Sequence, residues 1–243
     1  MERLRREMPD DTLCRQAWEA HATVDFANCL VNSERSFRGL VFPGPSDFTQ
    51  ALFEGNRFDS AATFGGAAFL RDASFRGVVF DGEAGFELAA FGGSVDFSGA
   101  VFRKPAQFRA ASFERMGRFA GARFDHDCWF RGARFEGPAS FARARFAREA
   151  GLGRTEFHNG ADFTASVFLD NAGFEHSRFL RGVSFRRAEF RARTWFLDLQ
   201  IAGLADMGGA VFNGPIIMDG GRTISAEDMK ARALADLVLR KAG

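Results

Sequence analysis

The chain has 243 residues, of which 46% are hydrophobic, enough to build a packed core and to exclude a disordered chain. Its 31 Phe, 3 Trp and no Tyr indicate dry interior positions that reject a hydroxyl group. The net charge of +1 is uneven, because residues 1–100 carry 9 basic and 15 acidic side chains whereas residues 101–200 carry 18 and 11.

Residues 1–35 precede any regular pattern, and we interpret them as an N-terminal segment or cap. The opening sequence MERLRREMPDD lacks the apolar stretch of a signal peptide. No run in the chain approaches the roughly 18 apolar residues that a membrane span needs. We therefore expect a cytoplasmic protein without a membrane span. A short helix is expected at residues 10–22, where it would cap the first coil of the repeat region.

The three cysteines, Cys14, Cys29 and Cys128, are too few and too scattered for a disulfide framework or a paired-thiolate metal site. They are consistent with the same reducing compartment.

Residues 36–218 carry a repeat of phenylalanines. From Phe53 to Phe146 the gaps between aromatic positions alternate between 5 and 6, so the period is 11 residues. Leu152 replaces one Phe, and the series then runs from Phe157 to Met218. The central positions of the expected core ladder are Phe64, Phe75, Phe86, Phe97, Phe108, Phe119, Phe130 and Phe141.

A small residue, most often Ala, stands two places before most of these positions. Two residues apart on an extended chain means the same face, so the small residue and the Phe both point inward. The neighbours of the Phe then point outward. Gly often follows two places after the Phe, as at Gly66, Gly121 and Gly137, which predicts corners.

An 11-residue repeat can also specify a helical coiled coil. Helical packing requires apolar spacings of 3 and 4, whereas these positions lie 5 and 6 apart. Each Gly would also cost a helix about 1 kcal/mol. The pattern therefore favours a β-solenoid.

Segments such as Ala73-Ser74-Phe75-Arg76-Gly77 and Ala133-Arg134-Phe135-Glu136-Gly137 resemble the pentapeptide-repeat proteins, whose unit carries a small residue two places before a central Leu or Phe. The resemblance covers roughly residues 36–218. It implies an all-β fold, a right-handed quadrilateral β-helix of about eight coils, with Phe stacked in columns. Ordinary members repeat every 5 residues, so we infer a 22-residue coil with an extra residue at two opposite corners, where Pro43, Pro45, Pro105 and Pro138 occur.

Residues 219–243 form the expected C-terminal cap. Within them, residues 225–241 predict an α-helix, with Ser225 as N-cap and Met229, Ala233 and Leu237 on its apolar stripe. Two roles are open for this helix. We favour a lid on the last coil, whereas the family resemblance implies a homodimer through the same helix.

The sequence predicts no catalytic, cofactor-binding or metal-binding residues, and hence no enzyme and no cofactor. His126 and Cys128 lie close together, but Cys128 occupies an inward small-residue position, where a thiol acts as a small hydrophobic group. Metal sites usually need three or four converging ligands.

The residues expected to point outward indicate a binding face. Trp129 and Trp195 each precede a Phe of the same 22-residue column, so both are expected outward on one face, three coils apart. Arg109 and Arg131 follow a Phe of that column and share the face. Exposed Trp with Arg is typical of interaction hot spots.

The leading hypothesis is a scaffold that presents flat β faces to a protein partner, whose identity the sequence does not give. The family resemblance implies a second function, imitation of DNA to bind a topoisomerase such as DNA gyrase. Mimicry of DNA demands a strongly acidic surface, so the net charge of +1 makes this function a weaker hypothesis than the scaffold. The third hypothesis is that the Arg-rich second half of the chain binds nucleic acid.

Overall fold

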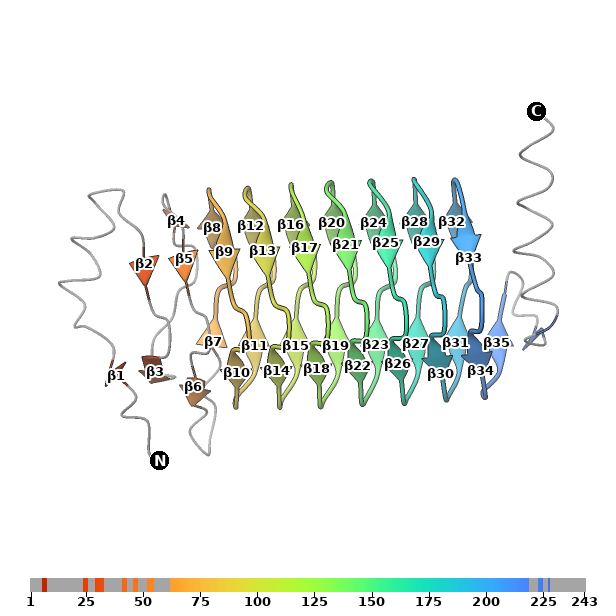
Figure 1. Ribbon diagram of the computed structural model, residues 1–243, viewed down its shortest axis with the longest axis horizontal. Coiled ribbons are helices and arrows are strands. Elements are labelled where there is room, and N and C mark those ends of the chain that lie inside the picture. Colours follow the sequence, from red (N-terminus) through yellow and green to blue (C-terminus); the bar gives the residue numbers. More distant parts are fainter. Residues whose placement is uncertain are drawn as a thin grey trace.

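The computed structural model describes residues 62–218 without interruption, with side chains from residue 64 onward. It also describes strands at 6–7, 24–25, 29–32, 41–42, 46–47, 52–54 and 223–224, and Glu227. Every secondary-structure element of this described part is a β-strand. The strands form four sheets, whose members stack one behind another along the long axis of the molecule (Figure 1).

Sheet 1 contains β1 (Arg6–Glu7), β3 (Cys29–Asn32), β6 (Leu52–Glu54), β10 (Val79–Phe80), β14 (Val101–Phe102), β18 (Arg123–Phe124), β22 (Arg145–Phe146), β26 (Val167–Phe168), β30 (Glu189–Phe190) and β34 (Val211–Phe212). Sheet 2 contains β7 (Ala62–Thr63), β11 (Ala84–Gly85), β15 (Ala106–Gln107), β19 (Cys128–Trp129), β23 (Ala150–Gly151), β27 (Ala172–Gly173), β31 (Thr194–Trp195), β35 (Ile216–Ile217) and β36 (Thr223–Ile224).

Sheet 3 contains β4 (Val41–Phe42), β8 (Ala68–Phe69), β12 (Ala90–Phe91), β16 (Ser112–Phe113), β20 (Arg134–Phe135), β24 (Glu156–Phe157), β28 (Arg178–Phe179) and β32 (Gln200–Ile201). Sheet 4 contains β2 (Val24–Asp25), β5 (Ser46–Asp47), β9 (Ala73–Ser74), β13 (Val95–Asp96), β17 (Gly117–Arg118), β21 (Ala139–Ser140), β25 (Ala161–Asp162), β29 (Val183–Ser184) and β33 (Ala205–Asp206).

The pairing is parallel, and from β7 to β35 each strand pairs with the strand 22 residues further on, as Val79 with Val101 and Ala84 with Ala106. The chain visits sheets 2, 3, 4 and 1 in turn, so each coil has four sides. Over residues 62–218 the result is an all-β solenoid of the right-handed type with about seven coils, whereas the predicted count of about eight applied to the longer range 36–218. Only β36 pairs antiparallel among the described strands.

Two opposite corners of each coil are longer than the other two. Successive Phe positions lie 5 residues apart across the corners from sheet 2 to 3 and from 4 to 1, and 6 apart across the corners from 3 to 4 and from 1 to 2. Pro105 and Pro138 both lie at six-residue corners, directly before a strand. The predicted extra residue at two opposite corners is therefore observed, whereas Pro43 and Pro45 lie outside the described residues.

At the five-residue corners, every eleventh residue from 66 to 209 has a positive φ. Glycine occupies Gly66, Gly77, Gly99, Gly121, Gly132 and Gly209, and other residues occupy Leu88, Ala110, Arg143, Arg154, Ala165, His176, Arg187 and Asp198. The amide of such a residue donates to a carbonyl of the next coil, as Ala110 does to Arg131 at 3.1 Å. Stacking thus holds a backbone conformation that side chains other than Gly disfavour.

Gly137 was also predicted as a corner. It lies at a six-residue corner, as Gly93 does, and both positions require Gly because a Cβ would clash with the preceding coil. A Cβ at Gly137 would lie 2.3 Å from the carbonyl carbon of Arg115 on the preceding coil. The same Gly pattern therefore has two physical causes, one conformational and one steric.

The core consists of Phe rings stacked in four columns, because each ring recurs in register on the next coil. Phe108 and Phe130 stack with centroids 4.6 Å apart and planes 2° apart. All eight residues of the predicted ladder are fully buried, and they alternate between sheets 2 and 4. Rings of these two sheets meet edge to face at the centre of the coil, as Phe97 and Phe108 do at 5.4 Å and 86°.

Several expectations concern the ends of the chain. The predicted helices at 10–22 and 225–241 lie outside the described residues, except for Glu227. The domain boundaries 1–35, 36–218 and 219–243 remain a prediction, although β1, β2 and β3 of the first segment pair within sheets 1 and 4. Between Val41 and Ala68 the pairing register is 27 residues, so one early coil holds five residues more than the later ones.

Within the part of the chain that the structure describes, no helix has the length and apolarity needed to cross a membrane.

Candidate functional site

The outward positions of sheet 2 hold the side chains that differ most from the surrounding pattern. In sheet 2, the first residue of each two-residue strand from β19 to β31 points into the core and the second points away from it. The outward residues are Trp129, Gly151, Gly173 and Trp195. Their strands pair successively in register, so two tryptophans flank two adjacent coils that present no side chain at this position.

Each tryptophan lies beside an arginine. The guanidinium carbon of Arg109 is 5.3 Å from the centre of the Trp129 ring, and that of Arg193 is 5.6 Å from the Trp195 ring. Both distances suit a cation–π contact. Arg109 was predicted for this face, whereas Arg193 was not, because it stands at a corner rather than beside a Phe. The motif Arg193-Thr194-Trp195 was the available signal.

The absence of side chains at Gly151, Gly153 and Gly173 leaves space that the side chains of Trp129 and Glu175 occupy. A Cβ at Gly151 would lie 2.4 Å from Cε3 of Trp129, so the indole leans over this glycine. A Cβ at Gly153 or Gly173 would lie 2.4 Å or 2.6 Å from a carboxylate oxygen of Glu175. The Trp129 ring and the Glu175 carboxylate therefore both cover backbone that the glycines leave bare.

A hollow of about 330 Å³ lies between the two tryptophans. Its lining residues share sheet 2 and the corners beside it: Trp129, Arg131, Glu149, Gly151, Gly153, Gly173, Glu175, Trp195 and Leu197. Three of the four predicted face residues, Trp129, Arg131 and Trp195, line this hollow. The fourth, Arg109, lies in the preceding coil and stacks on Trp129. The sequence prediction missed the glycine floor and the two glutamates. The signal was that Gly occupies two successive outward positions of one column.

Two carboxylates, those of Glu149 and Glu175, line this hollow. The pKa of the Glu149 carboxyl is raised, first because burial removes water from it and then because Asp127, Asp170 and Glu175 repel its negative charge. Among the ion pairs of the described residues, none involves Glu149 or Glu175. The hollow therefore contains two carboxylates that form no ion pair among the described residues.

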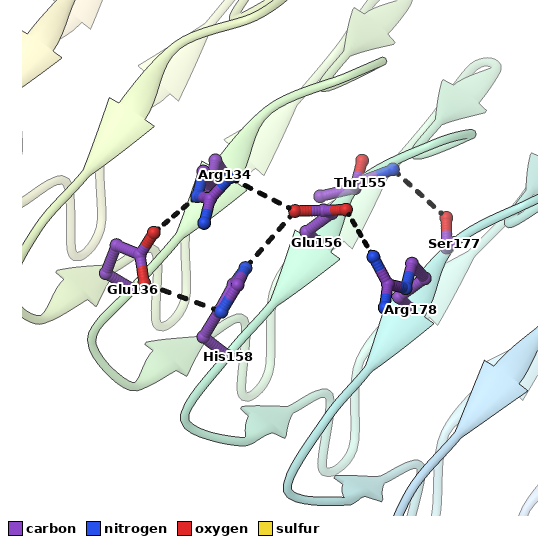
Figure 2. A network of polar contacts seen from close by, with 7 residues as sticks. All are labelled: Arg134, Glu136, Thr155, Glu156, His158, Ser177 and Arg178. Atoms are coloured by element: carbon purple, nitrogen blue, oxygen red, sulfur yellow. Dashed lines mark hydrogen bonds and ion pairs between the residues drawn. The ribbon is translucent and has the colours of Figure 1, made fainter.

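A second polar surface lies on sheet 3, where charged side chains pair along the stack (Figure 2). Arg134 donates to Glu136 on its own strand and lies 3.6 Å from Glu156 on the next coil. Arg178 reaches the same Glu156 from the following coil at 2.9 Å. Since Glu156 also contacts His158 at 3.2 Å, its carboxylate has three partners.

These contacts lower the pKa of Glu156, chiefly through the hydrogen bond with His158, against the effect of burial, and then through Arg178. Beneath them, the hydroxyl of Ser177 donates to the carbonyl of Leu152 at 2.6 Å and accepts from the amide of Thr155 at 3.3 Å. The polar groups here satisfy one another, which is typical of a structural ladder.

His126 and Cys128 do not converge. Cys128 is fully buried in the inward position of β19, and burial raises the pKa of its thiol well above the ordinary value. His126 accepts a hydrogen bond from the amide of Asp127 at 2.8 Å through Nδ1. In the described part of the chain, no three His, Cys, Asp or Glu side chains are placed to hold a metal ion.

Four parallel sheets, two-residue strands and a 22-residue register define this molecule as a four-sided β-solenoid repeat protein. Comparison with known proteins gives the family. Residues 86–134 and 119–167 match the family described as "Pentapeptide repeats (9 copies)". Residues 86–167 therefore consist of pentapeptide repeats with Phe at the centre of their units, as the sequence predicted. Searches of curated proteins and of solved structures found no match.

Proposed function

We propose that this protein is a non-enzymatic scaffold that binds a partner protein through sheet 2. The observation that supports this most is the pair Trp129 and Trp195, half-buried, each beside an arginine and placed on either side of a hollow. Half-buried tryptophan and arginine dominate the binding energy of many protein interfaces. The pentapeptide-repeat fold agrees with such a role, because its stacked coils give a rigid, extended face.

The test is capture of partners from the native lysate with the wild-type protein and with the double variant Trp129→Ala/Trp195→Ala. We expect the partner to be lost with the double variant, because both anchors of the face are removed. A matched control is Leu70→Ala/Leu204→Ala, which removes two exposed apolar side chains, 55% and 59% exposed, away from sheet 2. Equal capture by both variants would contradict the use of this face.

Binding to DNA gyrase by imitation of DNA ranks lower as a proposal. DNA presents an unbroken line of negative charge, about one per 1.7 Å. On sheet 1, pairs of opposite sign alternate instead, such as Arg103 with Asp81 and Arg123 with Asp125. The same pairing reduces the contribution that Arg103 and Arg123 could make to nucleic-acid binding, because a paired guanidinium releases fewer counterions. A supercoiling assay and a salt-dependent DNA-retention assay test these two functions.

A further inference from the structure

We propose that the hollow between Trp129 and Trp195 is a receptor for one arginine side chain of the partner protein. This proposal rests on the proposed binding function and names the chemistry of the group that is bound. The occupant would lie between the Trp129 and Trp195 rings, with its guanidinium beside Glu149 and Glu175. Charge, floor and walls support it independently.

The charge of the hollow selects a cation. Glu149 and Glu175 both line it, and the described residues give neither of them an ion-pair partner. Repulsion from Asp127, Asp170 and Glu175 contributes to the raised pKa of Glu149. A cation placed among these carboxylates removes that repulsion, whereas an anion increases it.

The floor selects a side chain rather than an added β-strand. The carbonyls of Gly151 and Gly173 already accept hydrogen bonds, from the amides of Phe130 and Leu152, each at 2.7 Å. The carbonyl of Gly153 accepts from Gly132 at 3.1 Å. Sheet 2 is continuous through the hollow, so no free sheet edge is available there for strand addition.

The walls select arginine over lysine. A planar guanidinium stacks on an indole and can bind a carboxylate through two N–H groups, whereas an ammonium is a compact, strongly hydrated charge. The protein already shows this preference at both walls, since Arg109 lies over Trp129 and Arg193 over Trp195. Arg109 belongs to the coil on the side of Trp129 away from Gly151, so it is outside the hollow.

Arg131 is the one cation that lines the hollow. It is exposed, and among the described residues it has no ion-pair partner. Its charge opposes a cationic occupant, so Arg131→Gln is expected to tighten binding of arginine a few-fold. If the hollow binds an anion instead, the same substitution weakens binding.

The experiment titrates the full chain with the blocked peptide Gly-Ser-Arg-Ser-Gly and with the same peptide carrying Lys, citrulline or Glu at the centre. The readout is the indole N–H signals in nitrogen–proton correlation spectra, assigned with Trp→Phe variants. We expect the Trp129 and Trp195 signals to shift with the Arg peptide. Binding should fall a few-fold for Lys, about tenfold or more for citrulline, and be absent for Glu.

Two kinds of variant keep the test sharp. Glu149→Gln and Glu175→Gln remove charge at constant shape and should weaken Arg-peptide binding, whereas Glu114→Gln, on sheet 3, should not. Gly173→Leu should block the hollow. The three atoms nearest to a Cβ at this position all belong to the flexible carboxylate end of Glu175, so the fold should be retained, as a thermal melt would verify.

Equal binding of the Arg and citrulline peptides, a preference for the Glu peptide, or no shift of either signal would overturn the proposal. The result can be separated from the scaffold function. Loss of partner capture in the double Trp variant without any Arg-peptide binding would leave the scaffold standing and refute the arginine receptor.

Discussion

Phe119 of sheet 4 and Phe130 of sheet 2 meet at the centre of the coil, with ring centroids 5.2 Å apart and planes at 89°. Phe119 also stacks on Phe97 at 5.0 Å and on Phe141 at 4.9 Å, in the coils before and after. Each ring of the core is thus held along its own column and across the centre. This double contact makes the solenoid cooperative, because one ring stabilises three neighbouring coils.

The first prediction follows from this geometry. Phe119→Ala should lower the free energy of unfolding by about 3–5 kcal/mol, because it leaves a cavity among stacked rings. Urea titration followed by circular dichroism measures the change. Phe212→Ala is the matched control. Phe212 is only partly buried and, among the described residues, stacks on Phe190 and meets Phe196 edge to face, so a smaller loss is expected. Equal losses at both positions would contradict a core that depends on neighbours on both sides.

The second prediction concerns the corners. Gly121 has φ of +65° and a Cβ there would meet nothing within 4 Å, so Gly121→Ala tests backbone conformation alone. We expect a loss of about 1 kcal/mol, since alanine disfavours this region. Ala110→Gly at an equivalent corner, where φ is 53°, should raise stability by a similar amount. Urea titration of both variants is the measurement, and a change of the same sign in both would refute the explanation.

The third prediction concerns Glu149. Its pKa is raised in the folded state, so its ionisation opposes folding at pH values above the ordinary carboxyl range and has no effect below it. Glu149→Gln should therefore raise the melting temperature at pH 7, and the gain should vanish below about pH 4. Thermal melts of both proteins from pH 3 to pH 8 measure this. A gain that persists in acid would assign the effect to packing instead.

The fourth prediction is the opposite case on sheet 3. The pKa of Glu156 is lowered, so its ionised form stabilises the fold at pH values above the ordinary carboxyl range. This stability is lost as the pH falls through the lowered pKa. Glu156→Gln should lower the melting temperature at pH 7 and have little effect once the wild-type carboxylate is protonated. High salt should reduce the difference, because the arginine partners are about half exposed.

Several features of the fold were predictable because they depend only on local spacing. Alternation along an extended chain places the small residue and the Phe on one face, so the buried columns follow from the sequence. The gaps of 5 and 6 likewise predict unequal corners. The eight residues other than Gly with positive φ were not predictable from the Gly pattern. Their conformation is held by hydrogen bonds to the next coil, as between the amide of His176 and the carbonyl of Leu197.

The candidate site also combines features that follow from local spacing with features that depend on contacts between coils. The 22-residue period alone placed Trp129 and Trp195 in one column with outward side chains. It did not reveal that Trp129 leans over Gly151, that Glu175 crosses Gly153 and Gly173, or that Glu149 lies among other carboxylates. These relations depend on side-chain directions between adjacent coils. Such directions are set by packing and charge in three dimensions, and no spacing along the chain encodes them.

The sequence by itself therefore determined the repeat, the inward and outward faces and the unequal corners, because a short repeat imposes the same local geometry many times. The four-sided coil followed from the resemblance to pentapeptide repeats. Only the tertiary structure decided which outward residues become neighbours and what lies between them. Stacking at a 22-residue register joined two tryptophans, two outward glycines and two glutamates that form no ion pair among the described residues into one hollow. The physical reason is that the chemistry of a surface depends on contacts between coils, whereas the core depends on a pattern within each coil.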